Sequence, residues 1–157
     1  MLAKPFAQHE DEHDQEAPKR DFTGSRALLV DDNKMNQDIA IMILQESGFE
    51  VDVAFDGVEA VDMVTEAPAG HYDVVLMDVQ MPRMDGYEAT THIRALDDPQ
   101  KANVPIVAVT ANAFEEDVAT AKEAGMNGHL AKPYDIDAMM EMLDGLIPID
   151  PANTARP

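Results

Sequence analysis

Apolar and polar residues follow one another along the chain in blocks of two kinds. Short runs that are apolar at nearly every position are typical of strands buried on both faces of a sheet. Longer stretches with apolar residues three or four positions apart are typical of helices with one buried face. The short runs predict five strands, at Arg26–Val30, Val51–Phe55, Asp73–Asp78, Val104–Thr110 and Gly128–Ala131.

A segment with helical spacing follows each predicted strand, so five helices are expected. Gly48 and Gly125 stand where the first and fourth of these helices should end, and Asp135 is a suitable N-cap for the fifth. The apolar faces that define the helices are, in chain order, Met35, Ile39, Met42 and Ile43; Val58, Val61 and Val64; Ala89, Ile93 and Leu96; Phe114, Val118 and Ala121; and Ile136, Met139, Met140 and Leu143.

The strict alternation of strands and helices predicts an α/β fold. Right-handed crossovers would make all five strands parallel and cover both faces of the sheet with helices, which is a doubly wound arrangement. For a chain of this length we expect the flavodoxin-like strand order 2-1-3-4-5, in which binding sites lie beyond the carboxyl ends of the strands.

The alternation occupies only part of the chain. Residues 26–147 carry it and form the predicted domain. Residues 1–25 are mostly polar, rich in acidic groups and without apolar periodicity, so they are predicted to be a disordered acidic arm or linker. Residues 148–157 contain three prolines and are predicted to be a C-terminal tail.

The charge of the chain limits its partners. With 31 acidic and 11 basic residues, the formal net charge is −20, which repels nucleic acid phosphates and anionic membrane surfaces. No apolar run approaches the length of a membrane span. The chain has no cysteine, so disulfides, thiol catalysis and cysteine-bound zinc are excluded, and a location in the reducing cytoplasm is expected.

Polar residues stand at the carboxyl ends of four predicted strands, each after an otherwise apolar run. They are Asp31 and Asp32, Asp78, Thr110, and Lys132. In the order 2-1-3-4-5 these four strands are contiguous, so the side chains should converge at one edge of the sheet. Three carboxylates crowded together repel one another and favour a hard divalent cation, for which Mg²⁺ is the expected choice.

This set of groups predicts phosphoryl transfer onto a carboxylate. Asp78, at the tip of the most apolar strand, is the candidate nucleophile, held on a rigid support. A cation would neutralise charge on the transferring group, while Lys132 and Thr110 would bind its oxygens.

Four short motifs surround these strand ends: Leu29-Val30-Asp31-Asp32-Asn33, Leu76-Met77-Asp78-Val79-Gln80-Met81-Pro82, Val109-Thr110-Ala111-Asn112-Ala113 and Leu130-Ala131-Lys132-Pro133. In this order, over residues 26–147, they resemble the receiver domains of two-component response regulators. The stretch from Met81 to Thr90 is similar to receivers attached to hybrid histidine kinases. The resemblance implies the CheY-like form of the predicted fold.

The resemblance also implies a role for each site residue. Asp78 would accept the phosphoryl group, with Lys132 and Thr110 assisting. Mg²⁺ (or Mn²⁺) would be bound by Asp31, Asp32, Asp78 and the main-chain carbonyl of Gln80. Thr110 and His129 would be the switch residues, although His129 replaces the tyrosine or phenylalanine usual in the family. Gln80 and Asn112 are expected to tune the lifetime of the phosphorylated state.

The partners implied are a histidine kinase or a histidine phosphotransfer protein. The first predicted helix and the loops around Asp78 are the expected docking surface for either of these partners. A phosphorylation-dependent dimer through the fourth helix, fifth strand and fifth helix is a further expectation. No direct contact with nucleic acid or membrane is expected.

Alternatives to a hybrid-kinase receiver were also considered. The chain could be a stand-alone response regulator. An aspartate-nucleophile phosphohydrolase would need a second acid two residues after the nucleophile, where this chain has Gln80, and a flavin-binding relative would need a phosphate-binding loop where Asp31 and Asp32 stand. We therefore expect no turnover enzyme, only self-catalysed phosphorylation and dephosphorylation.

Overall fold

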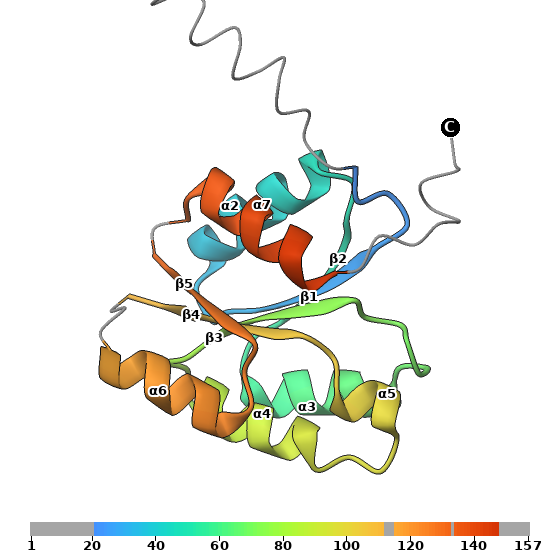
Figure 1. Ribbon diagram of the computed structural model, residues 1–157, viewed down its shortest axis with the longest axis vertical. Helices are drawn as coiled ribbons and strands as arrows, with labels where there is room; N and C mark the ends of the chain where they lie inside the picture. Colours follow the sequence, from blue (N-terminus) through green and yellow to red (C-terminus); the bar gives the residue numbers. More distant parts are fainter. Residues whose placement is uncertain (1–20, 112–114, 133, 148–157) are drawn as a thin grey trace, which may run out of the picture.

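The computed structural model describes residues 21–111, 115–132 and 134–147. A five-stranded parallel sheet runs through its centre, in the order β2-β1-β3-β4-β5 (Figure 1). The strands are β1 (Arg26–Val30), β2 (Glu50–Ala54), β3 (Val74–Asp78), β4 (Ile106–Thr110) and β5 (Gly128–Ala131). The predicted fold class and strand order are confirmed, and strand boundaries differ from the prediction by at most two residues.

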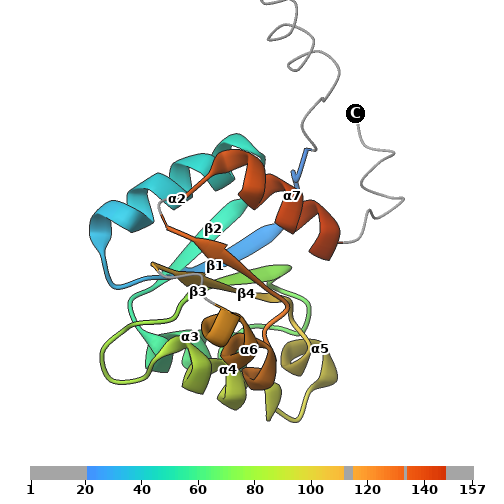
Figure 2. The same cartoon turned by 60° about the vertical axis from the view of Figure 1, so that its left-hand side comes forward.

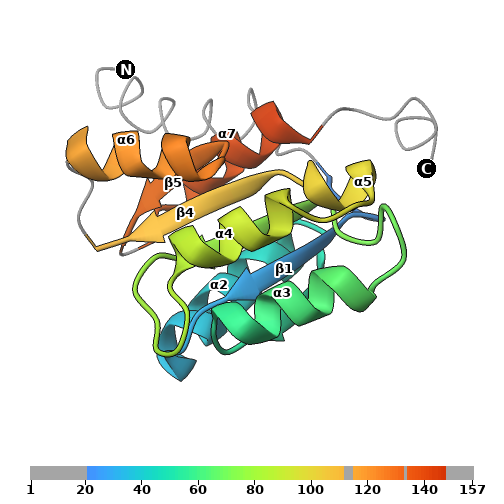
Figure 3. The ribbon, with the colours of Figure 1, turned by 90° about the horizontal axis from the view of Figure 1, so that it is seen from below.

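Helices cover both faces of the sheet. Figure 2 shows α2 and α7 side by side on one face, and Figure 3 shows α4 between α3 and α6 on the other. The helices are α2 (Lys34–Glu46), α3 (Gly57–Glu66), α4 (Gly86–Arg94), α5 (Pro99–Ala102), α6 (Glu115–Ala124) and α7 (Ile136–Leu146). None of those in the described ranges is both long and apolar enough to span a membrane.

The described residues therefore contain one helix more than the five predicted. The addition, α5, is a single turn between α4 and β4, started by Pro99 and capped by the side chain of Asp98, which accepts a hydrogen bond from the amide of Gln100. Proline at the first position favours helix initiation, but four residues are too few to show a helical period.

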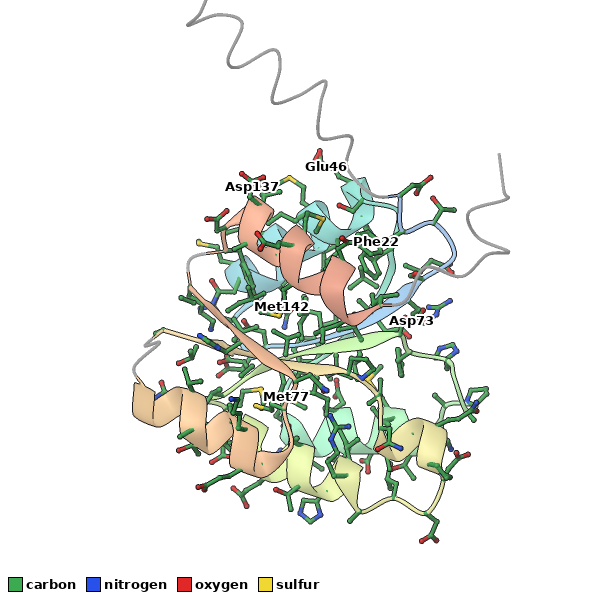
Figure 4. The ribbon with its side chains drawn as sticks, in the orientation of Figure 1. Phe22, Glu46, Asp73, Met77, Asp137 and Met142 are labelled. Carbon is green, nitrogen blue, oxygen red and sulfur yellow. The ribbon has the colours of Figure 1, made fainter. Side chains whose placement is uncertain are left out.

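Two apolar cores flank the sheet, because successive residues of a strand point to opposite faces. Val74 and Leu76 of β3 pack in the core under α2 and α7, whereas Val75 and Met77 pack in the core under α3 and α4. Figure 4 shows Met77 on the lower side of the sheet and Phe22 and Met142 on the upper side. Both faces being covered explains why the strands are apolar throughout.

The side of α2 that packs against the sheet is not the side that the sequence predicted to be buried. Of the predicted face, only Ile43 is buried, while Met35, Ile39 and Met42 are 72%, 40% and 56% exposed. The helix is apolar on most of its circumference, so periodicity alone could not identify the covered side. The buried residues are Gln37, Ala40, Ile43 and Leu44.

The packed domain begins earlier than the predicted boundary at Arg26. Phe22 is 2% exposed and stacks on Phe49, with 4.6 Å between the ring centroids. Ser25 is also buried. These residues fall within the predicted arm, so the arm assignment is wrong for them; residues 1–20, like the predicted tail from 148 to 157, lie outside the described residues.

Candidate functional site

Three carboxylates meet at the carboxyl edge of the sheet. Strands β1 and β3 are neighbours, with Val30 opposite Met77, so the residues that follow them, Asp31 and Asp78, lie next to each other. Asp32 completes the group, and one oxygen from each of the three lies within 4.8 Å of the others. The predicted convergence of these acids is present in the structure.

Asp31 presents one oxygen that the protein leaves without a hydrogen bond. The residue is fully buried, and its Oδ1 accepts a hydrogen bond of 2.8 Å from the amide of Asn33. Its Oδ2 is buried with no hydrogen-bond partner among the described residues. A buried carboxylate oxygen without a donor is costly unless a cation balances it. Three oxygen ligands, one of them in this condition, fit a hard divalent cation such as Mg²⁺.

Lys132 brings a positive charge to the same edge. Its amide donates a 2.8 Å hydrogen bond to the carbonyl of Thr110, which fixes the end of β5 against the end of β4. Its Nζ lies 3.2 Å from Asp78 Oδ2 and 3.5 Å from Asp31 Oδ2. One ammonium therefore contacts two of the three carboxylates, and the cluster keeps a net negative charge.

The environment of Asp78 raises the pKa of its carboxyl group to about 6. Burial is the main cause, and the nearby charge of Asp31 acts in the same direction. The ammonium of Lys132 and the amide of Gln80, which donates a 3.2 Å hydrogen bond to Asp78 Oδ1, oppose the shift. A divalent cation at this position would favour the ionised form that a nucleophile requires.

The other predicted site residues have different positions. Gln80 is exposed just beyond β3, and Thr110 ends β4, partly exposed. His129 lies on β5, which β4 separates from the strand that carries Asp78, and it lines a groove of about 510 Å³ together with α7. Asn112 lies outside the described residues.

Gln37 is a site residue that the sequence did not indicate. It is 3% exposed on the inner side of α2, and its Nε2 donates a 2.6 Å hydrogen bond to the main-chain carbonyl of Asp31. This bond ties the helix to the backbone that carries the acidic pair. The available signal was the spacing of Gln37 with Ala40 and Leu44, which placed an amide on a buried face.

The loop after Asp78 is held in place by contacts that the sequence also did not reveal. Arg83 has a φ of 66°, in the left-handed region, and its guanidinium forms two contacts with Asp56 Oδ2, at 2.7 Å from Nε and 2.6 Å from Nη2. Asp56 is buried and caps α3. Gly86 donates a hydrogen bond to the carbonyl of Val79, and a Cβ at Gly86 would lie 2.4 Å from the carbonyl oxygen of Asp78.

Large apolar side chains are exposed around this edge of the sheet. Met35, Ile39 and Met42 form a stripe on α2, which begins just after the acidic pair. Phe55 follows β2 and is 54% exposed, and Ile136 begins α7 and is 44% exposed. Exposed apolar residues gathered beside an acidic site are typical of a protein-binding surface.

Comparison with known proteins gives consistent results. A family model described as the response regulator receiver domain matches residues 27–144. Hybrid signal transduction histidine kinase B of Dictyostelium discoideum is 44% identical over 128 residues, which covers 75% of this chain but only 6% of that kinase. The chain spans 6 to 16% of the length of the curated relatives it matches.

Two solved structures are similar in both fold and sequence. The receiver domain of sensor histidine kinase PA1611 from Pseudomonas aeruginosa PAO1, with a magnesium ion coordinated in its active-site cleft, has a TM-score of 0.70 and 38% identity, covering 78% of this chain and 96% of that one. The receiver domain of the Saccharomyces cerevisiae response regulator Ssk1, crystallised with the histidine phosphotransfer protein Ypd1, has a TM-score of 0.70 and 30% identity, covering 78% and 88%.

Proposed function

This chain belongs to the family of response regulator receiver domains, and we propose that it accepts a phosphoryl group on Asp78 as one step of a two-component phosphorelay. The observation that carries the proposal is the position of Asp78. Its carboxylate is 4% exposed at the end of β3, beside two further acids and 3.2 Å from an ammonium. These surroundings fix the position and orientation of the carboxylate, as a nucleophile requires.

The proposed reaction transfers one phosphoryl group. An oxygen of ionised Asp78 attacks phosphorus, the new O–P bond forms as the bond from phosphorus to the donor breaks, and the donor leaves with that electron pair. Lys132, already in contact with Asp78, would bind a phosphoryl oxygen, and the hydroxyl of Thr110 would move towards another. The chain would act on itself in this way and in the later hydrolysis, in which a water oxygen attacks phosphorus and the bond to the Asp78 oxygen breaks, leaving the carboxylate with that electron pair and releasing inorganic phosphate. It would not be a turnover enzyme.

Asp31, Asp32, Asp78 and the main-chain carbonyl of Gln80 are the proposed ligands of Mg²⁺ or Mn²⁺. The close approach of the three carboxylates supports this assignment, as does Oδ2 of Asp31, which has no hydrogen-bond partner among the described residues, and so does the magnesium ion in the cleft of the Pseudomonas receiver. When bound, the cation would neutralise charge on the transferring phosphoryl oxygens.

We propose that Thr110 and His129 respond to phosphorylation. His129 lies on the edge strand and borders the groove beside α7, where a change of its rotamer would alter a surface. That surface, made by α6, β5 and α7, is the proposed place for a phosphorylation-dependent dimer. Gln80 and Asn112 are proposed to tune the lifetime of the acyl phosphate.

The proposed partner is a histidine kinase or a histidine phosphotransfer protein, docking over α2. The apolar stripe of Met35, Ile39 and Met42 begins next to the acidic cluster, so a partner covering it would bring its phosphohistidine to Asp78. The Saccharomyces receiver domain was crystallised with a phosphotransfer protein, which supports this class of partner.

We propose that residues 26–147, with the short buried segment that begins at Phe22, are a receiver domain within a hybrid histidine kinase of the cytoplasm. Residues 1–20 would be a linker and residues 148–157 a tail. The similarity to kinases many times longer supports this context. A stand-alone response regulator is the alternative, and it would use the same chemistry.

The test is intact mass after incubation with acetyl phosphate, with and without Mg²⁺. We expect a gain of one phosphoryl group in the wild-type chain that requires Mg²⁺ and is lost in Asp78→Asn. Asp62→Asn, at an exposed position of α3, is the matched control and should be phosphorylated normally. No gain in the wild type at any time, or an unchanged gain in Asp78→Asn, would contradict the proposal.

A further inference from the structure

An ion pair joins the loop that follows Asp78 to the start of α3. The guanidinium of Arg83 lies 2.7 Å from Asp56 Oδ2 through its Nε and 2.6 Å through its Nη2. Asp56 precedes α3 and caps it, because its Oδ1 accepts a 2.9 Å hydrogen bond from the amide of Glu59. One carboxylate therefore holds both the helix and the loop, with a separate oxygen for each.

This ion pair is better shielded than most pairs on a protein surface. Exposed ion pairs usually bind weakly, because water competes for both charges. Here the side chain of Asp56 is only 10% exposed, so water has little access to its carboxylate, although Arg83 is 63% exposed. Two nitrogens of one guanidinium contact the same oxygen, and charge-assisted contacts of this kind fix direction as well as distance.

The backbone of Arg83 has a conformation that arginine rarely adopts. Its φ is 66°, in the left-handed region where glycine is favoured. Residues in such conformations persist where the surrounding contacts determine them, and they are frequent at functional sites. A glycine here would avoid the strain but would lose the guanidinium, so the contact with Asp56 gives a reason for an arginine at this position.

The same loop carries Gln80. The amide of Gln80 donates a 3.2 Å hydrogen bond to Asp78 Oδ1, and its main-chain carbonyl is a proposed ligand of the cation. Further along, Met84 packs against the core under α3 and α4, and a Cβ at Gly57, the first residue of α3, would lie 2.5 Å from the carbonyl oxygen of Met84. Apolar packing has no preferred direction, so the ion pair of Arg83 is the contact that can fix the orientation of the chain between these two points.

We propose that Arg83 is a positioning residue of the cation site. By binding Asp56, it holds the loop in the arrangement that presents the carbonyl of Gln80 to the cation. Groups that orient a metal ligand from outside raise affinity by about 10- to 100-fold, and because Arg83 acts through the loop rather than on the ligand itself, we expect the lower end of this range. The inference rests on the proposed function, since it concerns the same cation.

Two substitutions test the ion pair from its two sides and change the charge in opposite directions. Arg83→Met keeps the apolar stem and removes a positive charge, so electrostatics alone would lower the Kd for Mg²⁺. Asp56→Asn keeps an N-cap for α3 and removes a negative charge, so electrostatics alone would raise it. If the ion pair positions the loop, calorimetry should show a Kd about 10-fold higher in both variants. The double variant should show the same increase rather than the product of the two.

Arg26→Met is the matched control. Arg26 begins β1, at the end of the strand remote from the acidic site, and its guanidinium lies 3.2 Å from Glu50 and 3.2 Å from Asp52. This variant also loses an arginine paired with carboxylates, but its Kd for Mg²⁺ should not rise. The thermal midpoint measured without divalent cations should fall no further in Arg83→Met than in this control. If Arg83→Met folds poorly, Arg83→Gly, which suits the left-handed backbone, takes its place.

A Kd in Arg83→Met equal to or below that of the wild type would overturn the inference. So would a wild-type Kd in Asp56→Asn, or single effects that multiply in the double variant. These results are measured against a wild type that binds Mg²⁺, so they leave the proposed function intact. A wild type that binds no Mg²⁺ and gains no phosphoryl group overturns the proposed function, and this inference with it.

Discussion

Asp78 is placed where its charge is unfavourable for the folded chain. The side chain is buried at the end of β3, and Asp31 adds a second negative charge beside it. The ammonium of Lys132 offsets only part of this cost, since the pKa of Asp78 remains raised to about 6. A residue positioned for stability alone would not be acidic here, so the arrangement is typical of a functional site.

The first prediction concerns Asp78→Asn in protein freed of divalent cations. The folded chain holds the pKa of Asp78 above the unfolded value of 3.8, so the proton binds more tightly to the folded state and stability falls as the pH rises through about 6. At about pH 8 the substitution should therefore raise the free energy of unfolding, by up to about 3 kcal/mol. Below about pH 4 this advantage should disappear.

Chemical denaturation across this pH range measures the effect. Asp62→Asn, at an exposed position of α3, is the control and should show no comparable pH-dependent gain. An Asp78→Asn variant less stable than the wild type at about pH 8, or a difference independent of pH, would show that the carboxylate is not held unfavourably.

At the scale of elements, Arg94 joins three consecutive segments of the chain to a fourth, after α6, that lies 31 residues away. It ends α4, and its guanidinium donates hydrogen bonds to the carbonyls of Ala102 at the end of α5, Val104 before β4 and Gly125 after α6. A fourth hydrogen bond, of 2.8 Å, reaches the side chain of Asn127. Burial lowers the pKa of Arg94, and within the described part of the chain these oxygens are the groups that bind its guanidinium.

The second prediction is that Arg94→Met destabilises the fold. The apolar part of the side chain remains, but three main-chain carbonyls lose a charged donor, so we expect a loss of about 3 kcal/mol or more in the free energy of unfolding. Urea denaturation measures it, with Lys122→Met at an exposed position of α6 as the control. A loss no larger than that of the control would mean that water replaces the guanidinium without cost.

The third prediction compares two helical glycines. A Cβ at Gly86, the first residue of α4, would lie 2.4 Å from the carbonyl oxygen of Asp78, whereas a Cβ at Gly145 in α7 would meet no atom within 4 Å. Gly145→Ala should stabilise by about 0.5 to 1 kcal/mol, because alanine has the lower conformational entropy cost in a helix.

Gly86→Ala should instead destabilise the chain by about 2 kcal/mol or more, because backbone must move to relieve the contact. The displaced backbone belongs to Asp78, so its rate of phosphorylation by acetyl phosphate should fall as well. Thermal denaturation and intact mass measure the two effects. Equal stability changes in the two variants would show that the joint between β3 and α4 tolerates a side chain.

At the scale of the whole molecule, strong acidity coexists with an exposed apolar stripe. The formal net charge of −20 disfavours anionic partners. The stripe of Met35, Ile39 and Met42 on α2 offers the apolar contact that a protein partner needs. Surface charge and apolar contact thus both agree with the proposed protein partner.

The fourth prediction separates docking from chemistry. Ile39→Asp, at the middle of the stripe, should slow phosphotransfer from a histidine phosphotransfer protein by about 10-fold or more, because the partner would have to bury a charge. Phosphorylation by acetyl phosphate should continue at the wild-type rate. Gln45→Asp, exposed on the same helix, is the control. Equal loss with both donors would show damage to the site, and no loss with either would place the docking surface elsewhere.

The sequence by itself determined the sheet and the acidic site. Burial on both faces makes a strand apolar throughout, so the strands and their order could be inferred before the structure was known. The polar residues at the strand ends, Asp31, Asp32, Asp78 and Lys132, then had to converge, because parallel strands end at one edge. These features depend on local patterns and on general rules of chain connection.

Only the tertiary structure decided which side of a helix is covered and which polar groups meet. The periodicity of α2 did not distinguish its buried side from the stripe at Met35, since neighbours in space determine burial. Arg94 and Gln37 are single polar residues whose partners no local pattern identifies: Arg94 bonds Gly125 and Asn127, 31 and 33 positions away, and Gln37 bonds the main chain of Asp31 across the loop between β1 and α2. Their roles follow from burial and from the distances to those partners, and a linear pattern contains neither.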